Sequence, residues 1–229
     1  MTIVVEGHCR MESRSKDQDS IMVMASWGNL NIDLGKNSVL EIEASPDRDK
    51  YTNIGIYMDI NRTLTVTGPG TLKVSGGDAR SDGGTSIALY APGNIIFEKD
   101  CSVSIISDTA SNISIGCWLE DGDFTLKDGS QIQIQGGKSS ESYGIDLSKD
   151  REYSFNSENW TGSMTVSGTS GALRTEGGKD ARIGIDSKNI HLTGYTDIGE
   201  HKSTILDKRI YKFKALQNYT KLYFEGCEN

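Results

Sequence analysis

The sequence predicts an all-β protein: a single-stranded parallel β-helix, or solenoid, with three short strands in each coil and a C-terminal cap. Apolar and polar residues alternate in short runs, and Gly, Ser, Asp or Pro closes each run. The same group of three runs returns at a period of roughly 28 to 40 residues. Because three strands and three turns recur without a helical pattern, each group is expected to form one coil of the solenoid.

Residues 62–91 show one coil most clearly. Its strands read LTV, LKV and IALY, with a Gly-Pro-Gly corner after the first and a polar Gly/Asp loop after the second. The first strand recurs at residues 30–34, 64–66, 95–97, 124–126, 164–166 and 190–192. The second recurs at residues 9–11, 40–42, 72–74, 103–105, 132–134 and 173–175. The third recurs at residues 20–24, 53–58, 86–91, 114–119, 143–148 and 182–187.

Stacked coils sort alternating residues into inward and outward ladders, because each strand pairs with its counterpart about 4.8 Å away. On the second strand, the predicted inward ladders are Cys9, Leu40, Leu72, Val103, Ile132, Leu173 and Met11, Ile42, Val74, Ile105, Ile134, Thr175. On the third strand, they are Ile21, Ile54, Ile87, Ile115 and Val23, Ile56, Leu89, Cys117, Ile145, Ile185.

The coils are predicted over residues 1–199, with residues 150–162 inserted on the solenoid wall between the fifth and sixth coils. The period fades after Gly199. Residues 200–229 are predicted as a capping segment of the same domain, with strands in YKFKAL and KLYFEG, because an open solenoid end exposes unpaired strand edges. The basic residues of this segment fit either a solvated cap or a binding patch.

Composition excludes some classes of function. The net charge of −8 and the pI of about 5.0 argue against nucleic-acid binding, which needs a basic surface. No apolar run is long enough for a membrane span. The chain opens directly within a strand, which predicts no signal peptide and suggests a domain of a larger parent surface protein. Its four cysteines lack metal-ligand spacing and read as buried or free thiols, with disulfide pairing left open.

The segments GTLKVSGG, GGTSIALYA and SQIQIQGG resemble the coils of right-handed parallel β-helix domains in bacterial surface and secreted proteins. The likeness is greatest to a carbohydrate-binding branch related to pectate lyase-like helices, and it spans about residues 2–194. The resemblance implies a right-handed helix, a secreted or cell-surface location, and binding of polysaccharide, often acidic and sometimes with calcium. Its motif is architectural and specifies little chemistry.

The third strand supplies a candidate binding face. Its predicted outward column is Met24, Tyr57, Tyr90, Trp118, Asp146, Asp186, beside a nearly bare column of Met22, Gly55, Ala88, Gly116, Gly144, Gly184. Aromatic rings can stack on sugar rings, and carboxylates accept hydrogen bonds from hydroxyl groups. Five residues are therefore predicted to bind sugar: Tyr57, Tyr90, Trp118, Asp146 and Asp186. The alternative is that the same residues only stabilise the wall.

A weaker candidate lies in the loops between the second and third strands. Asp47, Asp49, Asp78 and Asp82 would share Ca²⁺ if neighbouring loops stack. The alternative is that they are solvated turn residues, since Asp favours turns. No other cofactor is indicated.

An enzyme needs a catalytic set. Asp146 and Asp186, on adjacent predicted coils, could form a carboxylate pair for glycoside hydrolysis. The three histidines lie on separate elements and do not support a Ser/His/Asp triad. The sequence therefore favours a non-catalytic polysaccharide-binding module. A structural or adhesin module and a polysaccharide lyase or hydrolase are the alternatives.

Overall fold

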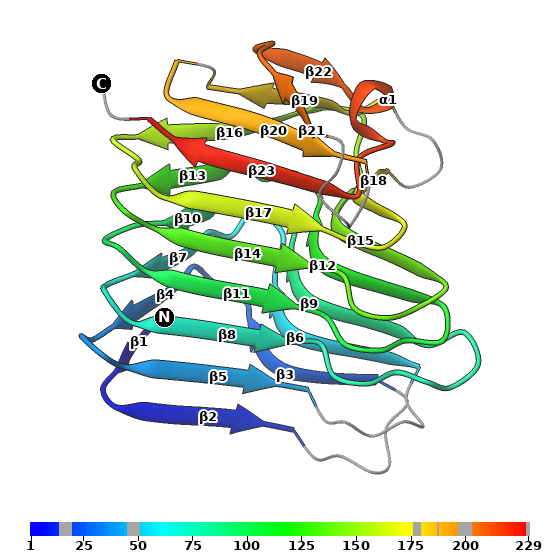
Figure 1. The fold of residues 1–229 in the computed structure, drawn as a ribbon. Helices are drawn as coiled ribbons and strands as arrows, with labels where there is room; N and C mark the ends of the chain where they lie inside the picture. The colour runs from blue at the N-terminus through cyan, green and yellow to red at the C-terminus, as the bar shows by residue number, and fades with distance from the viewer. Residues whose placement is uncertain (14–19, 45–50, 176–179, 187, 197–202, 228–229) are drawn as a thin grey trace.

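The computed structural model is a parallel β-solenoid of about five turns (Figure 1). It describes residues 1–13, 20–44, 51–175, 180–186, 188–196 and 203–227. The chain passes three sheets in turn, here named A, B and C, so the predicted all-β class with three strands per coil is confirmed.

From β1 to β18 each sheet receives one strand from each coil, and the strands that follow extend sheets A and B. Sheet A consists of β1 (Thr2–Val5), β4 (Leu30–Leu34), β7 (Leu64–Thr67), β10 (Ile95–Phe97), β13 (Phe124–Lys127), β16 (Glu152–Glu158), β19 (Arg182–Ile185) and β22 (Ile210–Lys212). Sheet B, which faces the viewer in Figure 1, consists of β2 (His8–Glu12), β5 (Val39–Glu43), β8 (Thr71–Ser75), β11 (Ser102–Ile106), β14 (Gln131–Gln135), β17 (Ser163–Ser167), β23 (Lys221–Gly226), β20 (Ile190–Tyr195) and β21 (Ser203–Leu206). Sheet C consists of β3 (Ser20–Ser26), β6 (Thr52–Met58), β9 (Thr85–Ala91), β12 (Ile113–Leu119), β15 (Glu141–Leu147) and β18 (Gly171–Thr175).

The inward side chains of the three sheets pack into one continuous core. On sheet B the two predicted ladders are confirmed from Cys9 to Ile132 and from Met11 to Ile134. Within the core, four phenylalanines stack along the solenoid axis with ring centroids 6.4, 5.1 and 4.9 Å apart: Phe97, Phe124, Phe155 and Phe224. Of these four, Phe124 and Phe155 lie directly opposite each other, whereas Phe97 lies opposite Leu126 and Phe224 reaches the stack from sheet B.

Residues 150–162 are not an insertion, contrary to the prediction. They contain β16, which pairs in parallel with β13 (Phe124 opposite Phe155) and with β19 (Phe155 opposite Ile185). Every later strand therefore belongs to a different sheet than predicted. Residues 164–166 lie in sheet B, residues 173–175 in sheet C and residues 182–185 in sheet A, while 190–192 join sheet B.

Loop lengths explain this error. The loops from sheet B to sheet C shorten along the solenoid, from residues 76–84 to 107–112, 136–140 and finally 168–170. The predicted second strand at Leu173–Thr175 is in fact β18 of sheet C, because only three residues separate it from β17. The ladders consequently end in Met164 and Val166 instead of Leu173 and Thr175.

Sheet C also departs from strict alternation. At the small residues Gly55, Ala88, Gly116 and Gly144 its strands bend, and these positions face inward. A Cβ at Gly116 would lie 2.8 Å from the backbone nitrogen of Gln135 on sheet B. Two consecutive inward positions shift the alternation by one residue, so the ladder Ile54, Ile87, Ile115 faces outward and not into the main core.

The N-terminal coil shows the same one-residue shift. Met24, predicted to face outward, is 5 % exposed and pairs with Ile56, and Met22 pairs with Ile54. The backbone of Ile21 lies opposite Asn53. The predicted ladder positions of Ile21 and Val23 were therefore wrong, and Ile185 is replaced by Leu173.

A buried polar ladder marks the corner where sheet C begins. Asn53, Ser86, Ser114 and Ser142 lie in register and are fully buried. The Ser86 hydroxyl donates to the carbonyl of Gly77 at 2.8 Å, and the Ser114 hydroxyl donates to the carbonyl of Asp108 at 2.8 Å. These hydrogen bonds fix the preceding loops and satisfy polar groups that burial would otherwise destabilise.

Antiparallel strands close the C-terminal end. β22 pairs antiparallel with β19, and β23 lies between β17 and β20, antiparallel to both (Figure 1). The segment YKFKAL, predicted as a strand, continues from β22 into the short helix α1 (Phe213–Leu216). Within the described ranges, no helix has the length and apolar character needed to cross a membrane.

The four cysteines are free thiols. Cys101 and Cys117 are buried, and burial raises the pKa of Cys101 to about 12. Cys9 is exposed although its ladder faces inward, since β2 is an outer strand of sheet B.

Phe155 tests the corrected position of β16. Phe155→Ala should lower the free energy of unfolding by about 3–5 kcal/mol, because it leaves a cavity in the phenylalanine stack. Asn156→Ala, at the next and exposed position, should change it by less than about 0.5 kcal/mol. Urea unfolding followed by circular dichroism measures both. Equal losses of unfolding free energy for the two variants would contradict the place of β16 in sheet A, with Phe155 facing the core.

Candidate functional site

The outer face of sheet C carries a column of large side chains in register. Tyr57, Tyr90, Trp118 and Asp146 lie opposite one another on β6, β9, β12 and β15, as the sequence predicts. The ends of the column differ from the prediction. Ala25 precedes Tyr57, and Arg174 of β18 follows Asp146.

Trp27 extends this column at its N-terminal end. Its indole contacts Tyr57 edge to face, with centroids 6.1 Å apart, and it is 71 % exposed. Trp27, Tyr57, Tyr90 and Trp118 are together called the aromatic row. The repeat pattern did not predict Trp27 as a site residue, because Trp27 lies just after β3, outside the repeating strand positions.

Ring orientation decides which faces of the row meet solvent. Tyr57 and Tyr90 are parallel within 4° at a centroid distance of 5.0 Å, so each covers a face of the other. Tyr90 and Trp118 are 5.8 Å apart and tilted by 49°. The two tyrosines therefore present mainly edges and hydroxyl groups, and the exposed aromatic face of the row is at Trp27.

Beside the row, the predicted bare column is absent. Its place is taken by the outward isoleucines, since the glycines of the bend face inward. Ile87, Ile113 and Ile115 form a separate apolar cluster, against which Tyr90, Trp118 and Tyr143 pack. These isoleucines are themselves buried, so the partly buried aromatic side chains cover an apolar cluster outside the main core.

Asp146 ends the row in an ion pair. Its side chain is fully buried, and its Oδ2 accepts from Nη1 of Arg174 at 2.8 Å. The Arg174 guanidinium also lies 5.7 Å from the ring centroid of Tyr143 and 3.9 Å from Glu141. Sequence reasoning assigned Arg174 to the second strand, so this pair could not be predicted.

Asp186 lies elsewhere. It follows β19 on sheet A, where Asn189 donates to its Oδ2 at 2.9 Å. The structure therefore brings together Tyr57, Tyr90, Trp118 and Asp146, but it does not place Asp186 with them. Asp146 and Asp186 consequently do not form the adjacent carboxylate pair that glycoside hydrolysis would require.

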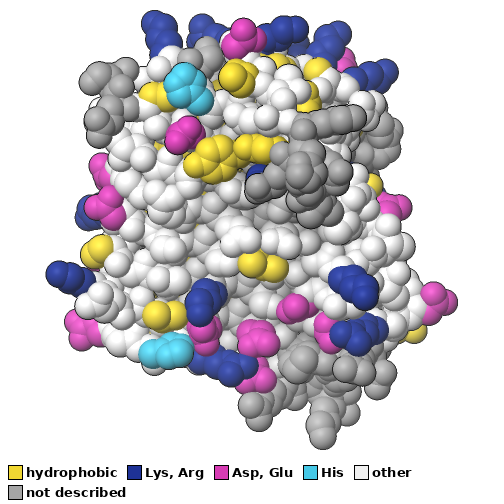
Figure 2. Space-filling model, viewed as in Figure 1, with side chains coloured by type: hydrophobic (Ala, Val, Ile, Leu, Met, Phe, Trp, Pro, Cys, Tyr) yellow, Lys and Arg dark blue, Asp and Glu magenta, His cyan; other side chains and the backbone are white. Residues whose placement is uncertain are grey.

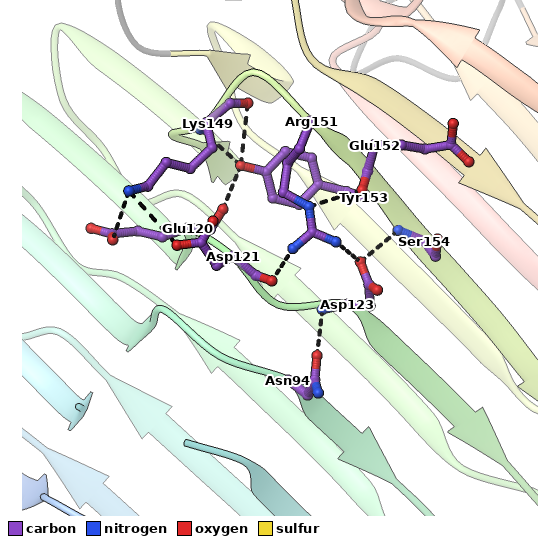
Figure 3. A network of polar contacts seen from close by, with 9 residues as sticks. All are labelled: Asn94, Glu120, Asp121, Asp123, Lys149, Arg151, Glu152, Tyr153 and Ser154. Atoms are coloured by element: carbon purple, nitrogen blue, oxygen red, sulfur yellow. Dashed lines mark hydrogen bonds and ion pairs between the residues drawn. The ribbon is translucent and has the colours of Figure 1, made fainter. Parts of the chain in front are cut away.

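A polar network lies at the corner between sheets C and A (Figure 3), and its Glu120 is also a hydrogen-bond partner of the aromatic row. The Tyr90 hydroxyl donates to Oε1 of Glu120 at 2.6 Å. Burial, and then this hydrogen bond to a carboxylate, raises the pKa of Tyr90. On the same corner, Arg151 pairs with Asp123 at 2.7 Å, and Asp123 accepts from the backbone N–H of Ser154 at 2.9 Å.

Tyr153 lies at the centre of this network and is fully buried. Its hydroxyl donates to the carbonyl of Glu120 at 2.7 Å and accepts from the N–H of Lys149 at 2.8 Å. Arg151 lies 5.0 Å above its ring. Burial raises the pKa of Tyr153 to about 12, outweighing the N–H of Lys149, which lowers it.

The predicted calcium ligands are only partly described. Asp47 and Asp49 lie outside the described residues. Asp78 pairs with Arg80 at 2.9 Å, and Asp82 is exposed. In the part of the chain that the structure describes, no three acidic, histidine or cysteine side chains gather as a metal site would require.

The outer face of sheet B offers a second surface, seen in Figure 2. Its middle carries mostly uncharged polar side chains, and charged ones gather at its N-terminal end. There Arg10 pairs with Glu43 at 2.6 Å and Lys73 with Glu41 at 2.9 Å. The hydrogen bonds from Lys73 and then His8 lower the pKa of Glu41. Because these charges pair with one another, they are less available to a ligand.

Comparisons of the chain with protein-family models, with curated proteins and with solved structures found no match in any of the three. Of the predicted resemblance, the parallel β-solenoid fold is the part that the structure supports.

Tyr153 predicts a dependence of stability on alkaline pH. A tyrosine has a pKa near 10 when unfolded, so the raised value stabilises the fold fully below about pH 10. This contribution is lost as the pH rises toward 12. Tyr153→Phe should be less stable than the wild type by about 1–3 kcal/mol at neutral pH, because two backbone groups lose their partner. The difference in the free energy of unfolding between the wild type and Tyr153→Phe should become smaller between about pH 10 and 12, as measured by urea unfolding. A stability difference that does not change with pH would contradict the raised pKa of Tyr153.

Arg174 is expected to stabilise the fold by neutralising Asp146. Arg174→Met should lower the free energy of unfolding by about 3 kcal/mol, because it removes the guanidinium that pairs with a fully buried carboxylate. Arg174→Met combined with Asp146→Leu should regain most of that loss. Arg80→Met, which breaks a more exposed pair, is the control and should cost at most about 1 kcal/mol. Denaturant unfolding at neutral pH measures these differences. Equal losses for Arg174→Met and Arg80→Met would contradict the stabilising role of Arg174.

Proposed function

We propose that this protein is a non-catalytic polysaccharide-binding module that holds its ligand along the outer face of sheet C. The observation that carries the proposal is the aromatic row, which crosses consecutive coils and ends in the exposed indole of Trp27. Coils repeat about every 4.8 Å, a spacing comparable to the length of one pyranose ring in an extended chain.

Each part of the row has a role in this proposal. Trp27 offers an exposed ring face on which the C–H face of a sugar can stack. Tyr57 and Tyr90 offer ring edges, which fit along the side of the chain. Because the row follows the solenoid axis, a linear polymer can contact several coils at once, and its weak individual contacts add up.

Binding without catalysis follows from the state of the acidic group. Asp146 is buried and paired with Arg174, so it does not face the position that a glycosidic bond would take on the row. A lyase or hydrolase is therefore the less favoured reading. The sequence-based expectations of a secreted or cell-surface location, and of a larger parent surface protein, accompany this proposal as predictions.

One observation favours a structural or adhesin module as the second candidate. Tyr57 and Tyr90 cover each other's faces, as residues do that stabilise a wall from coil to coil. On this reading Trp27 would contact a protein partner.

A glycan array followed by affinity gels tests the proposal. Neutral and acidic polysaccharides are screened with the wild type, with Trp27→Ala and with Ile205→Ala. Ile205, 79 % exposed on β21, controls for the loss of an exposed apolar side chain elsewhere. We expect Trp27→Ala to weaken binding about tenfold or more, because truncating an exposed aromatic anchor commonly costs that much.

The same screen is repeated with calcium and with EDTA. Loss of binding in EDTA would bring the aspartate loops into the site. Binding that Trp27→Ala and Trp118→Ala both leave intact would overturn the aromatic row as the site. Absence of binding to every polysaccharide would favour the structural module.

A further inference from the structure

A polar cleft lies on the outer face of sheet A, near the C-terminal cap. It has a volume of about 420 Å³ and is bounded by β16, β19 and the segment leading into β22. Its polar lining includes Glu152, Ser154, Asp186, Lys188 and Arg209. The cleft lies on a different sheet from the aromatic row. One of its walls is β16, which falls within residues 150–162, the segment that the sequence predicts as an insertion.

Gly184 creates the depression. On the three adjacent strands, Ser154, Gly184 and Ile210 lie opposite one another, and the middle position has no side chain. Oε1 of Glu152 lies 2.9 Å from the point where a Cβ of residue 184 would be. The missing side chain therefore lets the Glu152 carboxylate reach over the floor of the cleft. In Figure 3 this carboxylate points away from the corner network.

Side chains outside the cleft fix two of its lining residues, Ser154 and Asp186. Asp123 accepts from the backbone N–H of Ser154 at 2.9 Å and pairs with Arg151 at 2.7 Å. At the other end, Asn189 fixes the carboxylate of Asp186 at 2.9 Å. Groups that are already fixed lose little freedom when a ligand binds, so this arrangement is suited to binding.

Four charged groups face the cleft without pairing. Neither Glu152 nor Asp186 lies within ion-pair distance of Lys188, Arg209 or any other described cation. Two acidic acceptors and two basic donors thus surround one space, with no net formal charge. A ligand between them must offer both hydrogen-bond donors and acceptors.

We infer that this cleft binds a neutral sugar unit of one or two rings. A hydroxyl group both donates and accepts, so a ring with several hydroxyls can meet carboxylates on one side and cations on the other. Ile210, 48 % exposed, supplies an apolar wall for the C–H face of the ring. The volume lies in the lower part of the range for small-ligand sites. This inference does not rest on the aromatic row and survives if that proposal fails.

Backbone amide shifts in ¹⁵N-labelled protein test the inference. The probes are glucose, galactose, mannose, N-acetylglucosamine, cellobiose and chitobiose at millimolar concentration, with glycine as a zwitterion that lacks hydroxyls. At least one sugar should shift the amides of Ser154 and Gly184. Gly184→Ala should weaken this binding about tenfold, because its methyl group displaces only the end of the Glu152 side chain. Glu152→Gln, which keeps the shape, should weaken it similarly.

Trp27→Ala separates the two proposals. It should leave the shifts at Ser154 and Gly184 unchanged, whatever it does to polysaccharide binding. The inference is overturned if no sugar shifts these amides, if glycine alone does so, or if Gly184→Ala binds as well as the wild type.

Discussion

The structure depends on parallel pairing of each strand with its counterpart one coil on. Such pairing places each residue of a strand beside the equivalent residue of the next coil. A side chain that packs in the interior of one coil can therefore pack at the same position in the next. The contact of Phe124 with Phe155, the polar ladder at the corner and the outward tyrosines all follow from this one constraint. It also explains how a chain with 35 % hydrophobic residues forms a continuous core. Few apolar residues are needed when each inward position stacks on an inward apolar position of the next coil.

The same constraint determined what could be predicted from the sequence. The ladders of sheet B and the column Tyr57, Tyr90, Trp118 and Asp146 follow from alternation and period alone. The bend at Gly116 could not be predicted, because two consecutive inward residues break the alternation on which the reasoning depends. The last coil was misplaced because the shortened loop 168–170 removed the spacing that marks the third strand. Three important residues of the candidate sites lie where the repeat does not guide the prediction. Trp27 follows the end of β3, and Arg174 and Glu152 lie in segments that the sequence assigns to other positions.

The two candidate sites share one corner of the solenoid. Glu120 accepts from Tyr90 of the aromatic row, and its carbonyl accepts from Tyr153 of β16, the strand that carries Glu152 and Ser154 of the polar cleft. The two candidate sites are thus linked through the hydrogen bonds of Glu120. Because partly satisfied buried polar groups are costly, this corner is expected to be among the more rigid parts of the wall.

The position of β23 has a consequence for how the protein is made. This strand is synthesised after β17 and β20, yet it lies between them and pairs with both. The coils can form in sequence as they emerge from the ribosome, since each pairs with the one before it. Sheet B, however, keeps an open gap until residues 221–226 arrive, and Phe224 then completes the stack on Phe155. During that interval two unpaired strand edges are exposed, and a nascent chain at this stage is the form most prone to pair with another chain.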